Sequence, residues 1–298
     1  MKKYLYNIVL ATLILMSTTV VKASNEVYYI NNENVEMTEE EYNNLLSLGF
    51  SEKYISGMDQ EEFINNKDIE GTLLAETQKY IKTSTVVRNG IKTTTTEEIS
   101  REEAMKEKEL QSQNVPNRGP AGNYYDGMTY TSTISLTTKI VGISNSTMRY
   151  VNNMEWITIP TDRYRDIIGI GMEASKVQMS SLIAFKEEWV TSDGTPSHTK
   201  VCAPVYLSTG GLAIFDLPSG SLQSLEATLY YNVTKQSGVG TITSLYATGD
   251  YAHAISNISA NTLVSNVLIN VNGLSINYPY TYDFLSISPT VASFIGTW

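Results

Sequence analysis

Carboxylates are the side chains in this sequence best suited to catalysis. Glu187 and Glu188 are adjacent, and Glu173, Asp126 or Asp283 could add the second carboxylate that glycoside cleavage needs. Because neighbouring side chains on a strand point to opposite faces, only one of Glu187 and Glu188 can enter a given cleft. No spacing in the sequence selects its partner. A carboxylate-based glycoside hydrolase therefore stays an alternative, and we name no catalytic residue.

Other catalytic and cofactor patterns are missing or weak. The only histidines are His198 and His253, and the only cysteine is Cys202, so a three-histidine metal site and a Cys-x-x-Cys pair are excluded. A Gly-x-Ser-x-Gly elbow and a P-loop are also missing. His198 and Cys202 are four residues apart, but on a strand or loop this spacing does not converge as it would on a helix. We predict no metal, no cofactor, and a buried, inert Cys202 thiol.

Residues 169–174, Gly-Ile-Gly-Met-Glu-Ala, match a loose dinucleotide-binding fingerprint. That motif requires a preceding strand, a following helix and a βαβ unit around both. The surrounding sequence has the pattern of successive strands instead. We therefore interpret the two glycines as positions where a strand bends or another segment approaches closely.

Two groups of residues could bind a ligand without catalysis. Arg163 and Arg165 lie in the densest charge cluster of the C-terminal region and could hold a carboxylate or a sugar, although a solvated loop with local ion pairs fits the same pattern. Tyr278, Tyr280 and Tyr282 alternate along a short run. Tyrosine suits contact with sugars, peptides or another protein, but it also favours strands for packing alone. Binding by tyrosines would need several of them exposed on one face.

The N-terminus has the layout of a secretory leader. Lys2 and Lys3 precede an apolar run over residues 8–16, and residues 21–23, Val-Lys-Ala, form a small-residue cleavage site. Cleavage that removes residues 1–23 would take away three lysines and no acid, changing the formal net charge from −10 to −13. Such an acidic chain disfavours nucleic acid and anionic lipid as partners. We expect a protein that is secreted, extracellular or in the cell envelope, without a lipid anchor.

Residues 24–70 are predicted to form a small helical segment. Thr38, Ser51 and Asp59 each occupy an N-cap position before a short helical pattern, and glutamates three residues after Thr38 and Asp59 favour capping boxes. Gly49 occupies the position that commonly ends a helix. Three short helices with a miniature apolar core follow from this repeated pattern.

Part of this segment resembles a known group of proteins. The relevant residues are Met-Thr-Glu-Glu-Glu-Tyr at 37–42, Leu-Gly-Phe at 48–50 and Met-Asp-Gln-Glu-Glu-Phe at 58–63. They resemble the helical motif near the N-terminus of many uncharacterised exported proteins of Firmicutes. The resemblance implies export and carries no assigned activity. The Leu-Gly-Phe turn is also similar to the loop of ubiquitin-associated three-helix domains, which we interpret as convergent geometry.

The rest of the chain divides into three parts. Residues 71–112 are predicted to hold a hairpin around Asn89-Gly90, which favours a type I′ turn, and then a charged surface helix capped by Ser100. Residues 113–122 contain two prolines and two glycines and are predicted to be a linker. Residues 123–298 are predicted to be an antiparallel β-sandwich domain of about ten short strands, because period-two patterns alternate with frequent turns. The expected strands are 134–143, 148–159, 164–173, 182–191, 200–207, 212–216, 225–234, 241–248, 264–271 and 274–280.

These observations favour a non-catalytic binding or envelope-associated module. Cell-wall polysaccharide, host polysaccharide and protein are the expected classes of partner, and we expect no membrane insertion. One alternative of a different class remains, because residues 221–277 resemble the amphipathic strands of β-pore-forming toxins. An ordinary half-buried sheet gives the same pattern.

Overall fold

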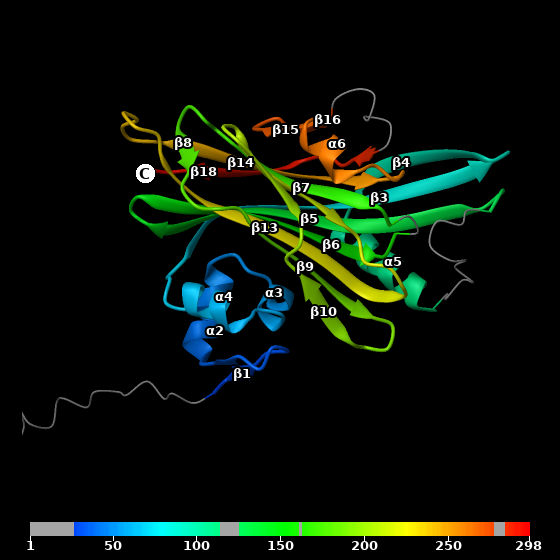
Figure 1. The fold of residues 1–298 in the computed structure, drawn as a ribbon, viewed down its shortest axis with the longest axis horizontal. Coiled ribbons are helices and arrows are strands. Elements are labelled where there is room, and N and C mark those ends of the chain that lie inside the picture. The colour runs from blue at the N-terminus through cyan, green and yellow to red at the C-terminus, as the bar shows by residue number, and fades with distance from the viewer. Residues whose placement is uncertain (1–26, 114–124, 161–162, 277–283) are drawn as a thin grey trace, which may run out of the picture.

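The computed structural model describes residues 27–113, 125–160, 163–276 and 284–298. The predicted leader and most of the predicted linker lie outside these ranges. The described part is built on two large antiparallel sheets packed face to face, with helices covering part of one outer face and two small two-stranded sheets outside the sandwich (Figure 1). The predicted antiparallel β-sandwich preceded by short helices is confirmed.

The helical segment begins as its capping residues predict. Thr38 accepts a hydrogen bond from the Glu41 amide while the Glu41 carboxylate accepts one from the Thr38 amide, and Ser51 and Asp59 cap the next two helices. Gly49 has a φ of 92°, which suits the turn after the first helix. The elements of this segment are β1 (Tyr29–Ile30), β2 (Glu36–Met37), α2 (Glu39–Ser47), α3 (Glu52–Ser56) and α4 (Gln60–Asn66).

The larger sheet has eight strands in the order β10-β9-β13-β6-β5-β3-β4, with β8 paired to β13. Its inner face supplies much of the main core. The predicted strand over 225–234 lies within β13, whose alternate side chains on the inner face are fully buried: Leu225, Ala227, Leu229, Tyr231 and Val233. The strands are β3 (Thr72–Arg88), β4 (Ile91–Ile99), β5 (Thr129–Ser144), β6 (Thr147–Thr158), β8 (Val177–Met179), β9 (Ala184–Thr191), β10 (Pro196–Thr199) and β13 (Leu222–Lys235).

The predicted Asn89-Gly90 hairpin is confirmed, and it is part of the larger sheet. Both turn residues have positive φ, 53° and 75°, as a type I′ turn requires. The first strand of the hairpin, β3, pairs with β5 along nearly its whole length. The larger sheet therefore begins about fifty residues before the predicted boundary at residue 123. The helix after the hairpin is α5 (Arg101–Gln113), which packs on the outer face of this sheet.

The smaller sheet has six strands in the order β11-β12-β7-β14-β17, with β18 also paired to β14. Its inner face closes the core around large buried side chains such as Trp156 and Tyr251. Sequence patterns missed the short strands β8, β10, β17 and β18, because three to six residues show too few alternations to detect. The strands are β7 (Arg165–Met172), β11 (Ala203–Leu207), β12 (Gly210–Asp216), β14 (Ser244–Ala254), β17 (Phe284–Ser286) and β18 (Thr290–Ile295).

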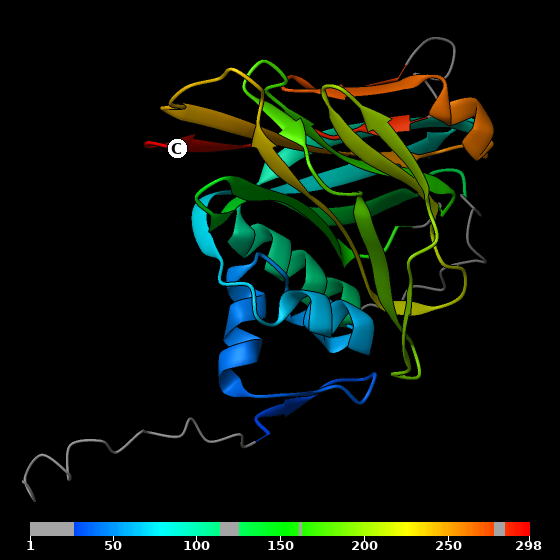
Figure 2. The same cartoon turned by 60° about the vertical axis from the view of Figure 1, so that its left-hand side comes forward.

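Each sheet carries a separate cover on its outer face. Helices α2–α4 lie on one side of the sandwich, and α6 (Ala260–Val264) with the hairpin of β15 (Val267–Asn270) and β16 (Gly273–Ile276) lies on the other (Figure 2). The predicted strand over residues 264–271 is wrong at its start. Ser259 caps α6 there, and Val264 ends that helix instead of opening a strand.

The two glycines of the loose fingerprint lie within β7. A Cβ on Gly171 would lie 1.9 Å from the carbonyl oxygen of Asn270, and one on Gly169 would lie 2.8 Å from Ile269 Cδ1. A turn, not a helix, follows this strand. The interpretation of both glycines as points of close approach is confirmed, because the β15–β16 hairpin rests on them.

Candidate functional site

Glu187 and Glu188 point to opposite faces of β9, as their adjacency predicts. Glu187 faces the inside of the sandwich and is 1% exposed, whereas Glu188 faces the helical segment and is 4% exposed. Burial, reinforced by the negative charges of Asp166 and Asp216, raises the pKa of Glu187 to about 9. Burial also raises the pKa of Glu188 to about 8, against the opposing effect of Lys186.

A second buried cluster lies on the Glu187 side of the sheet. Asp166 accepts hydrogen bonds from the Tyr251 hydroxyl and the Ala254 amide, and its carboxylate lies 3.0 Å from His253 Nδ1. An aspartate that orients a histidine is a common catalytic arrangement. The cavity beside His253 has a volume of only about 20 Å³, which is room for one water. The cluster holds β7 to β14 and leaves no space for a substrate.

The remaining predicted carboxylates brace loops. Glu173 forms an ion pair with Lys176 at 2.8 Å and accepts the Tyr246 amide at 3.0 Å. Asp126 accepts the amide of Gly90 in the hairpin turn. Asp283 lies outside the described residues.

The two predicted binding arginines also hold the fold together. Arg165 forms an ion pair with Asp216 at 2.7 Å and donates to the carbonyl of Ile258. Arg163 donates to the carbonyl of Pro218 at 3.1 Å. Arg165 therefore forms a local ion pair, as the alternative to ligand binding in the sequence analysis predicts. Tyr278, Tyr280 and Tyr282, the other predicted binding residues, lie outside the described ranges.

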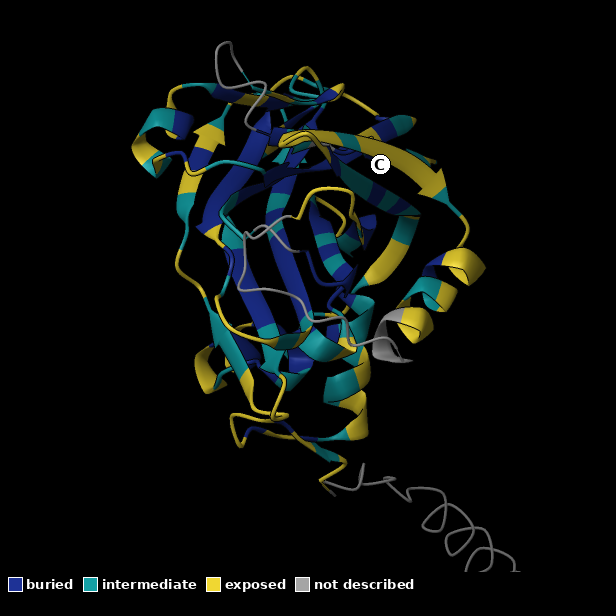
Figure 3. Ribbon diagram, turned by 90° about the vertical axis from the view of Figure 1, so that its right-hand side faces the viewer, coloured by how far each residue is buried: buried dark blue, intermediate teal, exposed yellow. Residues whose placement is uncertain are grey.

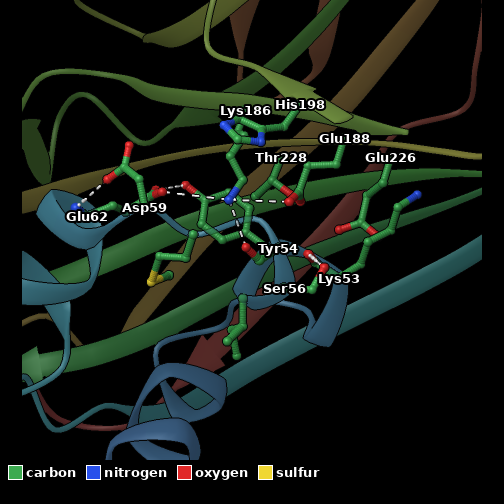
Figure 4. Close-up of polar contacts among 12 residues, drawn as sticks. Lys53, Tyr54, Ser56, Asp59, Glu62, Lys186, Glu188, His198, Glu226 and Thr228 are labelled. Carbon is green, nitrogen blue, oxygen red and sulfur yellow. Dashed lines mark hydrogen bonds and ion pairs between the residues drawn. The ribbon is translucent and has the colours of Figure 1, made fainter. Parts of the chain in front are cut away.

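Charged side chains fasten the helical segment to the outer face of β9 (Figure 4). Lys186 is fully buried; its Nζ donates to the Tyr54 carbonyl at 2.7 Å and lies 3.3 Å from Glu188 and 3.7 Å from Glu62. The same ammonium sits 3.9 Å from the centre of the Tyr54 ring, within the range of a cation–π contact. Lys200 reaches Glu62 from the more exposed side at 3.3 Å.

Two further ties extend this contact along the sheet. Arg149 donates to Asn66 Oδ1 at 3.0 Å, and its guanidinium lies over the rings of Phe50 and Tyr230 at 5.3 and 4.8 Å. Glu226 accepts hydrogen bonds from Asn153 and Ser51. We call all three contacts, centred on Lys186, Arg149 and Glu226, the charged interface. It fixes the helical segment and the sandwich as one unit.

A small cavity opens beside the charged interface. It measures about 90 Å³ and is lined by Lys53, Glu188, Trp189 and His198, among others. Ligand pockets for small molecules usually measure several hundred cubic ångströms, so this cavity has room for a few waters only. Burial lowers the pKa of the Lys53 ammonium, and the nearby Glu226 opposes that effect.

Three tyrosines meet on the outside of the helical segment. The Tyr42 ring lies 5.8 Å from the Tyr28 ring and 5.1 Å from the Tyr29 ring, measured between centroids. Tyr28 is 59% exposed, and the flanking Ile30 is 57% exposed. Burial against neighbouring groups, with help from Glu52, raises the pKa of Tyr29 and of Tyr42. We call Tyr28, Tyr29 and Tyr42 the tyrosine cluster.

Sequence reasoning missed the tyrosine cluster. Tyr42 lies within the first predicted helix, and Tyr28 and Tyr29 precede that helix. The short β1–β2 pairing folds the N-terminal residues back so that both groups meet beside α2. The available signal is the pair of consecutive tyrosines that ends nine residues before Thr38, the N-cap of the first predicted helix.

The sequence predicts no metal site and an inert thiol at Cys202. Within the described ranges, no three or more His, Cys, Asp or Glu side chains gather as a metal site would require. Cys202 is half-buried against the core, and burial raises the pKa of its thiol to about 11, so it is not ionised at neutral pH. None of the helices in these ranges combines the length and apolar character that crossing a membrane requires.

Comparisons with known proteins give slight likenesses only. No protein-family model and no curated sequence matches the chain. Among solved structures, the collagen-binding subdomain of the Enterococcus faecalis surface protein ACE is 8% identical, with a TM-score of 0.29 over 51% of this chain and 90% of that one. The collagen-binding domain of a Staphylococcus aureus adhesin is 6% identical, with a TM-score of 0.27 over 51% and 89%. At these TM-scores the likeness assigns no function to the chain.

Proposed function

We propose that this protein is an exported, non-catalytic binding module that contacts its ligand through the tyrosine cluster. The observation that carries the proposal is the contact of three tyrosine rings, of which Tyr28 is exposed and the other two are half-buried. The exposed side chains of Val27 and Ile30 border this contact. A polysaccharide or protein of the bacterial envelope or the host is the proposed ligand class.

Tyrosine clusters suit this role for a physical reason. Each ring offers a broad apolar surface with few rotatable bonds, and its hydroxyl can form a hydrogen bond at the edge of the contact. Tyrosine is enriched at protein interfaces for the same reason. The cluster lies on the helical segment, which the charged interface holds rigidly on the sheet, so binding orders little extra chain.

The alternatives find less support in the described residues. A glycoside hydrolase needs two carboxylates about a cleft, whereas Glu187 and Glu188 face opposite ways and the neighbouring cavities measure about 20 and 90 Å³. A pore-forming protein would need residues 221–277 to rearrange. Strands β13 and β14 lie within the larger and smaller sheets, each paired on both sides, so their release would disrupt the whole sandwich.

Sedimentation with insoluble ligands tests this function. Residues 24–298 would be incubated with bacterial cell wall, mucin or liposomes, with Tyr28→Ala as the test variant and Tyr125→Ala as its control. Tyr125 is 56% exposed, a fraction similar to the 59% of Tyr28, and it lies outside the tyrosine cluster. We expect retention on cell wall or mucin that Tyr28→Ala weakens about tenfold and Tyr125→Ala leaves unchanged.

Three results would contradict the proposal. Retention by liposomes alone would favour membrane insertion. Equal losses in the two variants would remove the tyrosine cluster from the contact. Release of reducing sugar from the cell wall, abolished by Glu188→Gln, would show a hydrolase.

A further inference from the structure

Strand β4 forms a long open edge of the larger sheet. It pairs with β3 on one side, and no described strand pairs with its other side. Seven of its nine residues are exposed, and in Figure 3 β4 is the largely yellow strand that precedes α5. The opposite edge of the sheet, β10, is only four residues long. Long edge strands with unpaired amides and carbonyls are templates for pairing with another strand.

The hairpin turn fixes which backbone groups of β4 face outward. A two-residue turn makes Arg88 and Ile91 a hydrogen-bonded pair, and hydrogen-bonded and non-hydrogen-bonded pairs alternate along an antiparallel ladder. The odd-numbered residues of β4 therefore direct their amides and carbonyls toward β3. The even-numbered residues, 92, 94, 96 and 98, direct theirs toward the open edge.

The sequence of β4 complements itself in one antiparallel register. When two copies pair antiparallel about Thr95, each outward-facing residue of one copy lies opposite an outward-facing residue of the other. In this register Lys92 of each copy lies opposite Glu98 of the other. A shift by two residues places Lys92 against Thr96, or Glu98 against Thr94, and loses the charge match. The centred register gives the pairs Ile91–Ile99, Lys92–Glu98, Thr93–Glu97, Thr94–Thr96 and Thr95–Thr95.

The side chains at this edge can accept such a partner. Opposite charges directly across two strands stabilise their pairing, and the two-fold symmetry supplies the Lys92–Glu98 pair twice. Glu98 forms an ion pair with Lys79 of its own chain at 3.2 Å but remains 58% exposed. The exposed part of this side chain can therefore meet a second cation.

We propose that two copies of this protein pair antiparallel along β4, with the two-fold axis at Thr95. The larger sheets of both copies then form one continuous sheet, and the contact is closed because each copy uses the same strand. This inference is independent of the proposed function, since the tyrosine cluster lies on the helical segment and not on β4.

Cysteine cross-linking tests the position of the axis. In the centred register Thr95 forms a non-hydrogen-bonded pair with its own copy, with Cα atoms about 4.5 Å apart, which is within the range of a disulfide. In the full mature chain carrying Cys202→Ala, we expect Thr95→Cys to form a covalent dimer under mild oxidation. Thr93→Cys is the matched control on the same face of the strand; it faces Glu97 and should stay monomeric.

A charge exchange tests the register independently. Sedimentation velocity over a concentration series would give the dimer dissociation constant of the wild-type chain. Lys92→Glu should raise that constant about tenfold, because two attractive pairs become repulsive. Combining Lys92→Glu with Glu98→Lys should return it to within about twofold of wild type.

Certain outcomes would overturn the inference. A wild-type chain that stays monomeric throughout the series would show that no second copy covers this edge, and pairing with a strand of another protein would then have to be sought. Equal cross-linking of Thr93→Cys and Thr95→Cys, or failure of the charge exchange to restore the dimer, would exclude the centred register.

Discussion

The two outer faces of the sandwich are covered in different ways. The helical segment rests on the larger sheet chiefly through the buried ionisable side chains of Lys186, Glu62 and Glu188. The Phe50 ring also packs against the Tyr230 ring of the sheet. The α6–β15–β16 cover rests on the smaller sheet through an apolar cluster that includes Ile167, Leu263 and Ile269. Buried charges stabilise a contact only when each has a partner, whereas an apolar contact depends on shape. The first cover should therefore respond mainly to charge and the second mainly to volume, with the buried Asp250 carboxyl, which accepts the Leu274 amide, as a charged contact of the second cover.

The largest effect should follow from removing the central cation of the helical cover. Lys186→Met keeps the apolar stem but removes the ammonium beside the buried Glu188 and leaves Glu62 with Lys200 alone. We expect a loss of about 3–5 kcal/mol in the free energy of unfolding, measured by denaturant titration. A loss below about 1 kcal/mol would mean that the charges do not fasten this cover.

The pH dependence of the helical cover should be the next largest effect. The pKa of Glu188 is raised from 4.5 to about 8, so the folded state keeps a proton that the unfolded state releases. The contribution of the Glu188 carboxyl to the free energy of unfolding is therefore fully present below pH 4.5, falls as pH rises toward 8, and then levels off. The glutamine of Glu188→Gln cannot ionise. As pH rises from 4 to 8, we therefore expect the free energy of unfolding of this variant to increase, relative to that of wild type, by on the order of 2–4 kcal/mol.

The matching measurement is a denaturant titration of both proteins at several pH values. Parallel stability curves for wild type and Glu188→Gln would show that the carboxyl ionises as freely in the folded chain as in the unfolded one. Such a result would contradict the raised pKa.

The apolar cover should respond to volume at one backbone position. Gly171→Ala places a Cβ against the carbonyl of Asn270, which must move away, and we expect a loss of about 1–3 kcal/mol. Hydrogen exchange should show faster opening of the β15–β16 amides than of α2–α4. Gly240→Ala is the control, because no atom lies within 4 Å of its added Cβ. Equal effects of both variants would contradict the close contact.

The smallest effect should come from the exposed Lys200, which lies beside the charged interface. Lys200 pairs with Asp59 at 2.7 Å and is 43% exposed. Solvent screens such pairs, so Lys200→Met should cost less than about 1 kcal/mol. Thermal unfolding of Lys200→Met and Lys186→Met compares the loss of stability on removing an exposed cation with the loss on removing a buried one. A cost as large as that of Lys186→Met would remove the distinction.

The two covers also differ in how much their sequences predict. The starts of α2, α3 and α4 follow from Thr38, Ser51 and Asp59, because a helix cap is a contact over three residues. The opposite directions of Glu187 and Glu188 follow from the alternation of side chains along a strand.

Distant pairing was beyond what local patterns reveal. Lys186 and Tyr54 are 132 residues apart, and nothing near either residue indicates their contact. The membership of β3 in the larger sheet depends on its pairing with β5, which follows a long connection. Local patterns also do not predict the tyrosine cluster. The β1–β2 pairing, not helical spacing, brings Tyr28 and Tyr29 to Tyr42.

Hydroxyl-radical footprinting of the mature chain, with and without the polymer that retains it, tests the central claim most directly. Tyr28 and Tyr42 should lose reactivity when the polymer is bound, while Tyr125 and Tyr206, which are exposed elsewhere on the molecule, should react as before. Retention of the protein with unchanged reactivity at Tyr28 and Tyr42 would contradict binding through the tyrosine cluster.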